Sequence, residues 1–115
     1  MINKREDMEF EEREKMRGGE GIIKILHFFK KEDFKANVRL CAKLIIEPGC
    51  SIGLHQHLDE DEVFIILKGK GIMYDGKNEY SVKEGDAILT GNGEQHSIKN
   101  IGKDNLEIIA FISKY

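Results

Sequence analysis

The sequence is poor in cysteine. Of its 115 residues only two are cysteines, Cys41 and Cys50, and they do not form a Cys-x-x-Cys pair. Two thiols without that spacing are more often reduced intracellular residues than a disulfide, a zinc site or a redox centre. We therefore expect both cysteines to be small side chains flanking a strand.

The sequence also lacks long apolar runs and an excess of one charge sign. Its 18 basic and 21 acidic residues are intermixed and give a net charge of −3, with no basic stripe for a nucleic-acid backbone. No apolar segment approaches the ~20 residues of a membrane span, and the first residues show no apolar run with a cleavage site. We therefore expect no nucleic-acid partner, no membrane insertion and a cytoplasmic location.

The sequence does contain a series of short strand-like segments. Runs of β-branched, aliphatic and aromatic residues recur about every 8 to 12 residues, separated by turn signals such as Asp75-Gly76. We expect strands over residues 22–29, 38–47, 52–57, 62–67, 69–74, 80–83, 87–90, 95–100 and 106–113. About nine to ten short strands without a long helix are typical of an all-β sandwich or barrel.

One of these segments carries polar residues in a distinctive pattern, at residues 49–69, which read GCSIGLHQHLDEDEVFIILKG. His55 and His57 lie two residues apart, and in an extended strand both imidazoles leave the same face, roughly 6 to 7 Å apart along the strand. Glu62 begins the next strand-like run, whereas the acidic residues 59–61 lie in the intervening turn as ordinary solvated turn formers. Two imidazoles and a carboxylate suit a divalent transition metal such as Mn, Fe, Ni or Zn.

A second block, residues 85–100, reads GDAILTGNGEQHSIKN and carries another histidine. His96 follows the tight-turn signal Gly91-Asn92-Gly93, so it too can point from a strand into a barrel interior. Polar groups that converge in an apolar barrel without a partner cost about 1 to 3 kcal/mol each. A metal removes that cost, so we expect one metal ion per chain, bound by His55, His57, Glu62 and His96. The alternative is a histidine cluster that binds nothing.

Both blocks resemble the sequence motifs of the cupin superfamily. The first motif is matched at Gly49, His55, His57, Glu62 and Gly69, and the second at Gly85, Gly93, His96 and Asn100. One position departs from the family pattern, because Gly91 stands where proline is usual. The resemblance implies a small jelly-roll (cupin) barrel of antiparallel strands with the metal inside. It also makes the chain similar to one half of a two-domain oxalate decarboxylase.

Residues next to the expected ligands are candidates for a pocket. Strand alternation puts Phe64 and Ile66 on the side of Glu62, and Ile98 on the side of His96. We expect these three as apolar pocket walls, and the alternative is that all three simply belong to the core.

The four ligands leave one or two positions of an octahedral ion open, where water or a small carboxylate can bind. Arg39 and Lys43 are most simply surface charges. The alternative is that one of them reaches the pocket mouth and pairs with an anionic ligand. His27 lies outside both motifs, and we expect no ligand role for it.

Residues 1–17 carry many charges of both signs and only a weak apolar pattern. We predict a charged N-terminal arm or swapped strand over residues 1–17, with a frayed helix as the alternative, and the cupin barrel domain over residues 18–115. The barrel has open sheet edges and the arm has no core of its own. We therefore expect a homodimer in which strand pairing or exchange covers both.

Two classes of function remain open. One is a metal-dependent decarboxylase, dioxygenase or isomerase acting on a small, oxalate-like acid, and the other is a non-catalytic module that binds a metal and a small carboxylate. Oxalate decarboxylases carry an arginine three residues before the first motif histidine, where it pairs with the substrate carboxylate. Here that residue is Ile52, which argues against their chemistry unless Arg39 takes its place. No clear proton donor is present, although Glu60 is a candidate to fold over the pocket.

Overall fold

The computed structural model describes residues 1–115 and confirms the all-β prediction, with ten strands and three short 3-10 helices. The strands are β1 Glu9–Glu14, β2 Ile22–His27, β3 Val38–Ile46, β4 Ser51–Gln56, β5 Glu60–Lys68, β6 Lys70–Tyr74, β7 Glu79–Lys83, β8 Ala87–Thr90, β9 Gln95–Asn100 and β10 Leu106–Lys114. The helices are η1 Arg5–Asp7, η2 Met16–Gly18 and η3 Lys31–Asp33. None of the three is long and apolar enough to cross a membrane.

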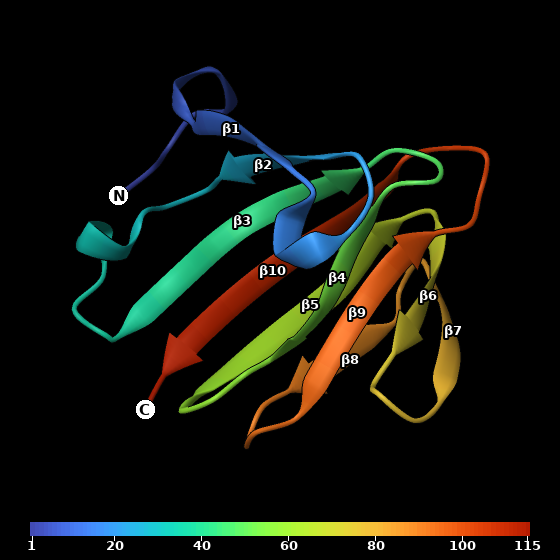
Figure 1. Cartoon of the computed structure of the whole chain (residues 1–115). Helices are drawn as coiled ribbons and strands as arrows, with labels where there is room; N and C mark the ends of the chain where they lie inside the picture. The colour runs from blue at the N-terminus through green and yellow to red at the C-terminus, as the bar shows by residue number, and fades with distance from the viewer.

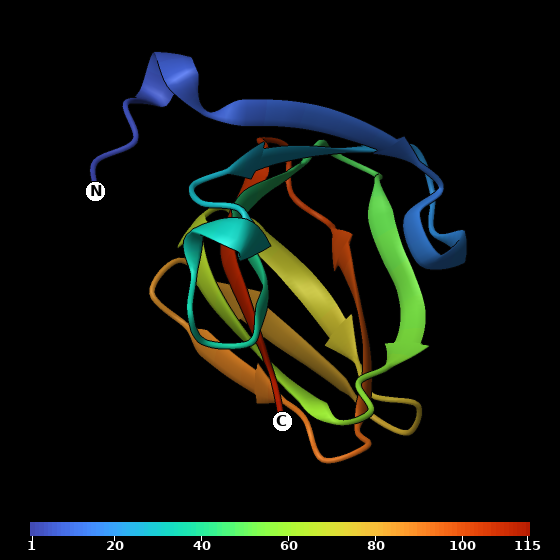
Figure 2. The same cartoon turned by 90° about the vertical axis from the view of Figure 1, so that its left-hand side faces the viewer.

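The strands form two antiparallel sheets that face each other (Figure 1, Figure 2). The six-stranded sheet has the order β1-β2-β3-β10-β5-β8, and the four-stranded sheet has the order β4-β9-β6-β7. The apolar core lies between the sheets and includes Ile25, Leu44, Ile66, Ile98 and Ile108. Burying each such side chain stabilises the fold by about 1.5 to 3 kcal/mol.

Strand β5 shows how the sequence pattern determines which side chains face inward. Glu60, Glu62, Phe64 and Ile66 are buried, whereas Ile65, between two of them, is 41% exposed. This period of two is that of a strand with one face on the core and one toward solvent. The same alternation that packs the core therefore also carries two carboxylates into the interior.

Alternation fails at one position of β3. Ile112 of β10 pairs with Leu40, but the next residue, Ser113, pairs with Val38, which leaves Arg39 as the extra residue of a β-bulge. A bulge redirects the side chain that it carries. Arg39 stays exposed, but its side chain reaches the edge of a cavity between the sheets, whereas strict alternation would have put it wholly on the outer face with Cys41. Both cysteines are free.

The N-terminal segment adds an edge strand to the larger sheet. Strand β1 pairs with β2 only, and it lies outermost in Figure 2. Residues 9–14 therefore form a strand and not the alternative frayed helix. The following turn, with η2, packs against β4 of the other sheet.

Candidate metal centre

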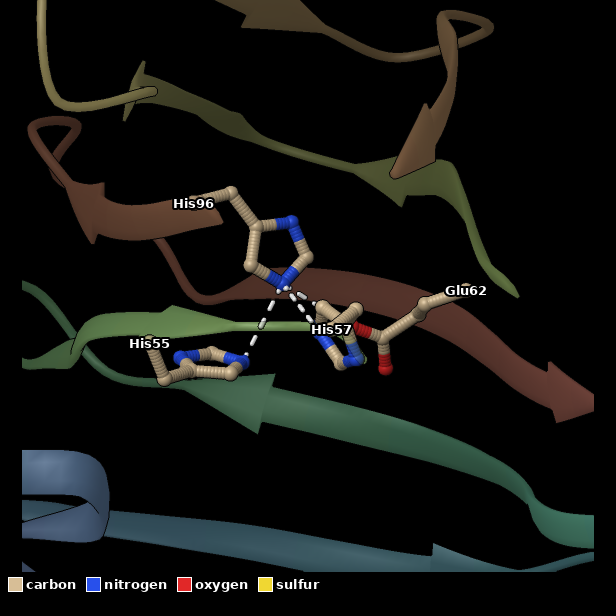
Figure 3. Close-up of side chains that lie close together, drawn as sticks. All are labelled: His55, His57, Glu62 and His96. Atoms are coloured by element: carbon tan, nitrogen blue, oxygen red, sulfur yellow. Dashed lines mark hydrogen bonds and ion pairs between the residues drawn. The ribbon is translucent and has the colours of Figure 1, made fainter. Parts of the chain in front are cut away.

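Four side chains converge between the two sheets: His55, His57, Glu62 and His96 (Figure 3). One ligand atom from each lies within 4.8 Å of all the others. The Nε2 atoms of His57 and His96 are 3.0 Å and 2.9 Å from Glu62 Oε1. The Nε2 atom of His96 is 3.0 Å from that of His57 and 3.2 Å from that of His55.

Backbone pairing brings these residues together from separate parts of the chain. His55 on β4 lies directly opposite His96 on β9. His57 follows β4, and its backbone N–H donates to the Glu94 carbonyl while its carbonyl accepts from the Gly93 N–H. Glu62 comes from β5 in the opposite sheet. The site is therefore fixed by both sheets and by the turn before β9.

The second nitrogen of each imidazole is held by a hydrogen bond. The Nδ1–H of His55 donates to the Gly53 carbonyl at 2.7 Å and that of His57 to Glu60 Oε2 at 2.7 Å, while His96 Nδ1 lies 2.9 Å from Thr90 Oγ1, a hydroxyl that can donate or accept. A carbonyl can only accept, so neutral His55 carries its proton on Nδ1 and presents a bare lone pair on Nε2. This arrangement of outer hydrogen bonds is the one that orients metal-binding histidines in proteins.

The donor set fits a divalent transition metal. When the Nε2 atoms carry no proton, as metal binding requires, the three imidazoles direct Nε2 lone pairs at one another and at the Glu62 carboxylate. Lone pairs facing one another in a buried site are unfavourable unless a cation lies between them. Three imidazole nitrogens and one carboxylate oxygen are ligands that Mn, Fe, Ni and Zn all accept.

The charges of the group fit one neutral imidazole and an ionised carboxylate, while the proton that His57 shares with Glu62 has to leave when a metal binds. Burial lowers the pKa of His55 to about 4, so this imidazole is neutral at physiological pH. Burial also opposes protonation of His57, but hydrogen bonds to Glu62 and Glu60 raise its pKa above the ordinary value. Burial works against the charge on Glu62 as well, yet hydrogen bonds from His57 and His96 lower its pKa. The carboxylate is therefore ionised and ready to act as a ligand.

Glu60 has a larger part in the site than its position in an acidic turn suggests. It is the first residue of β5 and only 8% exposed, so the interpretation of this residue as a solvated turn former is wrong. Arg39 donates to it twice, at 3.1 Å and 2.8 Å. Burial raises its pKa, but Arg39 and His57 together lower it to about 2. A permanently ionised Glu60 fixes the tautomer and orientation of His57.

A cavity of about 100 Å³ opens beside the cluster and is lined by three of its members, His55, His57 and Glu62. Phe64 lines it and stacks on the His96 ring, with ring centroids 5.0 Å apart, and Arg39 lies at its edge. Ile66 and Ile98 belong to the packed core and do not line this cavity, so their role as pocket walls stays a prediction. Lys43 pairs with Glu107 at 3.0 Å, and His27 pairs with Glu11 at 2.6 Å.

A larger cavity of about 400 Å³ is lined by His96 and Thr90 together with residues that include Tyr74, Tyr80 and Leu89. It contains none of the other three converging residues. The small cavity, which three of the four residues line, therefore gives a ligand the wider access to the cluster.

Comparison with known proteins identifies the family. The cupin domain family matches residues 42–112, which is more than half of the chain, and the chain belongs to this family. A Thermotoga maritima protein named oxalate-binding protein is 41% identical over 97 residues, covering 84% of this chain and 80% of that protein.

Solved structures show the same fold. The chain superimposes with a TM-score of 0.94 and 36% identity on a Thermotoga maritima protein described as a predicted oxalate decarboxylase, with all of both chains covered. It also superimposes on KdgF from a Halomonas species with a TM-score of 0.76 over all of this chain and 96% of the other, at 14% identity. The second likeness concerns the fold alone. Together these matches confirm the prediction of a small cupin.

Proposed function

We propose that this cupin binds one divalent transition metal (Mn, Fe, Ni or Zn) through His55, His57, Glu62 and His96, and that a small carboxylate such as oxalate binds at an open position of the metal. The observation that carries the proposal is the convergence of three Nε2 atoms and the Glu62 carboxylate, with the Nδ1–H groups of His55 and His57 donating outward. A bound metal would supply a positively charged centre with an exchangeable position for an anionic oxygen.

The cavity beside the cluster has the size and lining for such a ligand. Its volume of about 100 Å³ holds about three water molecules at ~30 Å³ each, which is also the size of a two-carbon dicarboxylate. Phe64, Leu40 and Ile112 give it apolar walls. An anion that replaces water there lies in a medium of low dielectric constant, where attraction to a cation is stronger than in bulk water.

The acids around the cavity favour binding over catalysis. A decarboxylase or isomerase needs a group that delivers a proton near neutral pH. The pKa of Glu60 is held at about 2 against its burial by Arg39 and His57, and that of Glu62 is also lowered. Neither carboxyl group carries a proton to give, so we propose a binding module, with the metal-dependent enzyme as the alternative. The named oxalate-binding relative supports this assignment.

Oxalate should raise the melting temperature of the metal-loaded protein and leave that of the metal-free protein unchanged. A ligand that binds only the metal-loaded native form at a hundredfold excess over its Kd stabilises it by about 2.7 kcal/mol. For a domain of this size that corresponds to a shift on the order of 10 °C. Differential scanning calorimetry with and without a chelator measures the effect, and equal shifts in both samples would place the acid elsewhere. A reaction product formed from oxalate in the metal-loaded samples would favour a metal-dependent enzyme over a binding module.

We also propose that the chain forms a homodimer. Strand β1 is an open edge of the larger sheet, and several apolar side chains of the first ten residues are exposed: Met1, Ile2 and Phe10. A second copy that pairs along this edge would cover them. Light scattering at micromolar concentration should give twice the chain mass of 13.2 kDa. The monomer mass at that concentration would contradict the proposal.

A further inference from the structure

The N-terminal segment contributes charged residues to the mouth of the small cavity. The lining of this cavity includes His55, His57, Glu62 and Phe64, and it also includes exposed Arg13 from β1 and half-buried Met16 and exposed Arg17 from η2. These three residues lie more than 35 positions before the first histidine of the site. A segment that appeared from sequence to be a peripheral arm therefore borders the candidate ligand site.

Backbone contacts fix the η2 turn on the strand that carries His55. A Cβ on Gly53 would lie 2.1 Å from the Arg17 carbonyl oxygen, and a Cβ on Gly19 would lie 2.1 Å from the Ser51 carbonyl oxygen. Only glycine permits so close an approach. Two hydrogen bonds between Glu20 and Ser51, one in each direction and each of 2.9 Å, also hold the turn on the strand. The turn is thus positioned by the same strand that positions the metal ligands.

The three arginines at the cavity differ in how their charges are used. The Arg39 guanidinium is engaged by Glu60, and that of Arg13 pairs with Glu11 at 3.2 Å. Arg17 makes no ion pair or side-chain hydrogen bond within the chain, and its backbone is in the left-handed region, with φ of 55°. Such a conformation is uncommon for a residue with a side chain and often marks a functional site. Arg17 is the cation left free to meet an anion.

We propose that Arg17 binds the carboxylate of the acid that faces the cavity mouth, so that the N-terminal turn is part of the ligand site. This inference rests on the proposed binding of a small dicarboxylate to the metal. One carboxylate of such an acid would lie at the metal, and the other would extend toward the rim. A guanidinium binds a carboxylate through two parallel N–H···O bonds, which makes arginine the suitable residue for this contact.

The test compares two variants that remove the same charge from the same segment. Arg17→Met should keep the metal content of the wild type and weaken oxalate binding by about tenfold, the loss expected for a charge-assisted hydrogen bond. Arg5→Met, in η1 and outside the cavity lining, should bind oxalate as the wild type does. Isothermal titration calorimetry on the metal-loaded proteins gives the affinities, and elemental analysis gives the metal content.

Acetate provides an internal control for the assigned contact. Its single carboxylate would bind the metal, so acetate has no second carboxylate for Arg17 to contact. Arg17→Met should therefore change acetate affinity by less than about twofold, because only weak long-range attraction is lost. Arg17→Lys keeps the charge without the planar fork and should fall between wild type and Arg17→Met for oxalate.

Three results would overturn the inference, and the last is distinguishable from the first two. If wild type binds oxalate and Arg17→Met binds it equally well, or if Arg5→Met is weakened to the same extent, Arg17 is not the contact while the proposed function stands. If metal-loaded wild type binds no oxalate, both the contact and the proposed ligand are wrong.

Discussion

Replacing His57 by alanine should reduce the metal content from about one equivalent to under about a tenth of an equivalent after dialysis. Loss of a residue that binds the metal directly should weaken metal affinity by more than the ten- to hundredfold seen when a residue that only supports a ligand is removed. His57 contacts two other members of the cluster, because its Nε2 atom lies 3.0 Å from both Glu62 Oε1 and His96 Nε2. Its removal eliminates one nitrogen ligand and also leaves buried Glu60 without one of its donors. Elemental analysis of protein reconstituted with each candidate metal measures the result.

His27→Ala is the matched control for that experiment. His27 also lines the small cavity, but its Nε2 atom pairs with Glu11 at 2.6 Å and it is not among the four converging residues. This variant should keep the full metal content. Equal metal loss in both variants would indicate that damage to the cavity, and not loss of a ligand, releases the ion.

Replacing Glu60 by alanine should weaken metal affinity about ten- to hundredfold while leaving all four expected ligands in place. Glu60 accepts the Nδ1–H of His57, so its carboxylate both holds the ring orientation and makes Nε2 a better donor. Without it, the His57 ring is free to turn and to carry its proton on Nε2. Competition with a chromophoric chelator measures the affinity at equilibrium.

Glu107→Ala is the appropriate control for Glu60→Ala, because Glu107 also takes part in an ion pair on the six-stranded sheet, with Lys43 at 3.0 Å. It removes the same charge and should leave metal affinity unchanged. If Glu60→Ala binds metal as tightly as the wild type, the outer hydrogen bond to His57 has no part in metal binding.

Local patterns in the sequence were sufficient to predict the strands, and the match of both blocks to the cupin motifs supported the predicted convergence of four residues. The His-x-His spacing and the alternation from Glu62 onward depend only on strand geometry, which places every second side chain on one face. The structure has a strand in each of the nine expected segments, and it brings together His55, His57, Glu62 and His96.

The features that local patterns did not predict depend on long-range pairing. Arg39 reaches the cavity because of a bulge opposite Ile112 and Ser113, and a bulge is a property of two paired strands. The η2 turn lies beside the site because Gly19 and Gly53, far apart in sequence, approach without side chains. The buried position of Glu60, however, could have been predicted from the sequence. Glu60 has the same strand parity as Glu62, and extending the expected strand by two residues would have placed its side chain inside.

The central claim is that His55, His57, Glu62 and His96 hold one metal ion, and elemental analysis of the wild-type protein tests it most directly. Protein purified without added metal, and then reconstituted and dialysed, should contain about one equivalent of a divalent transition metal per chain, as expected for three imidazoles and one carboxylate. Less than about a tenth of an equivalent after reconstitution with Mn, Fe, Ni and Zn in turn would contradict the account.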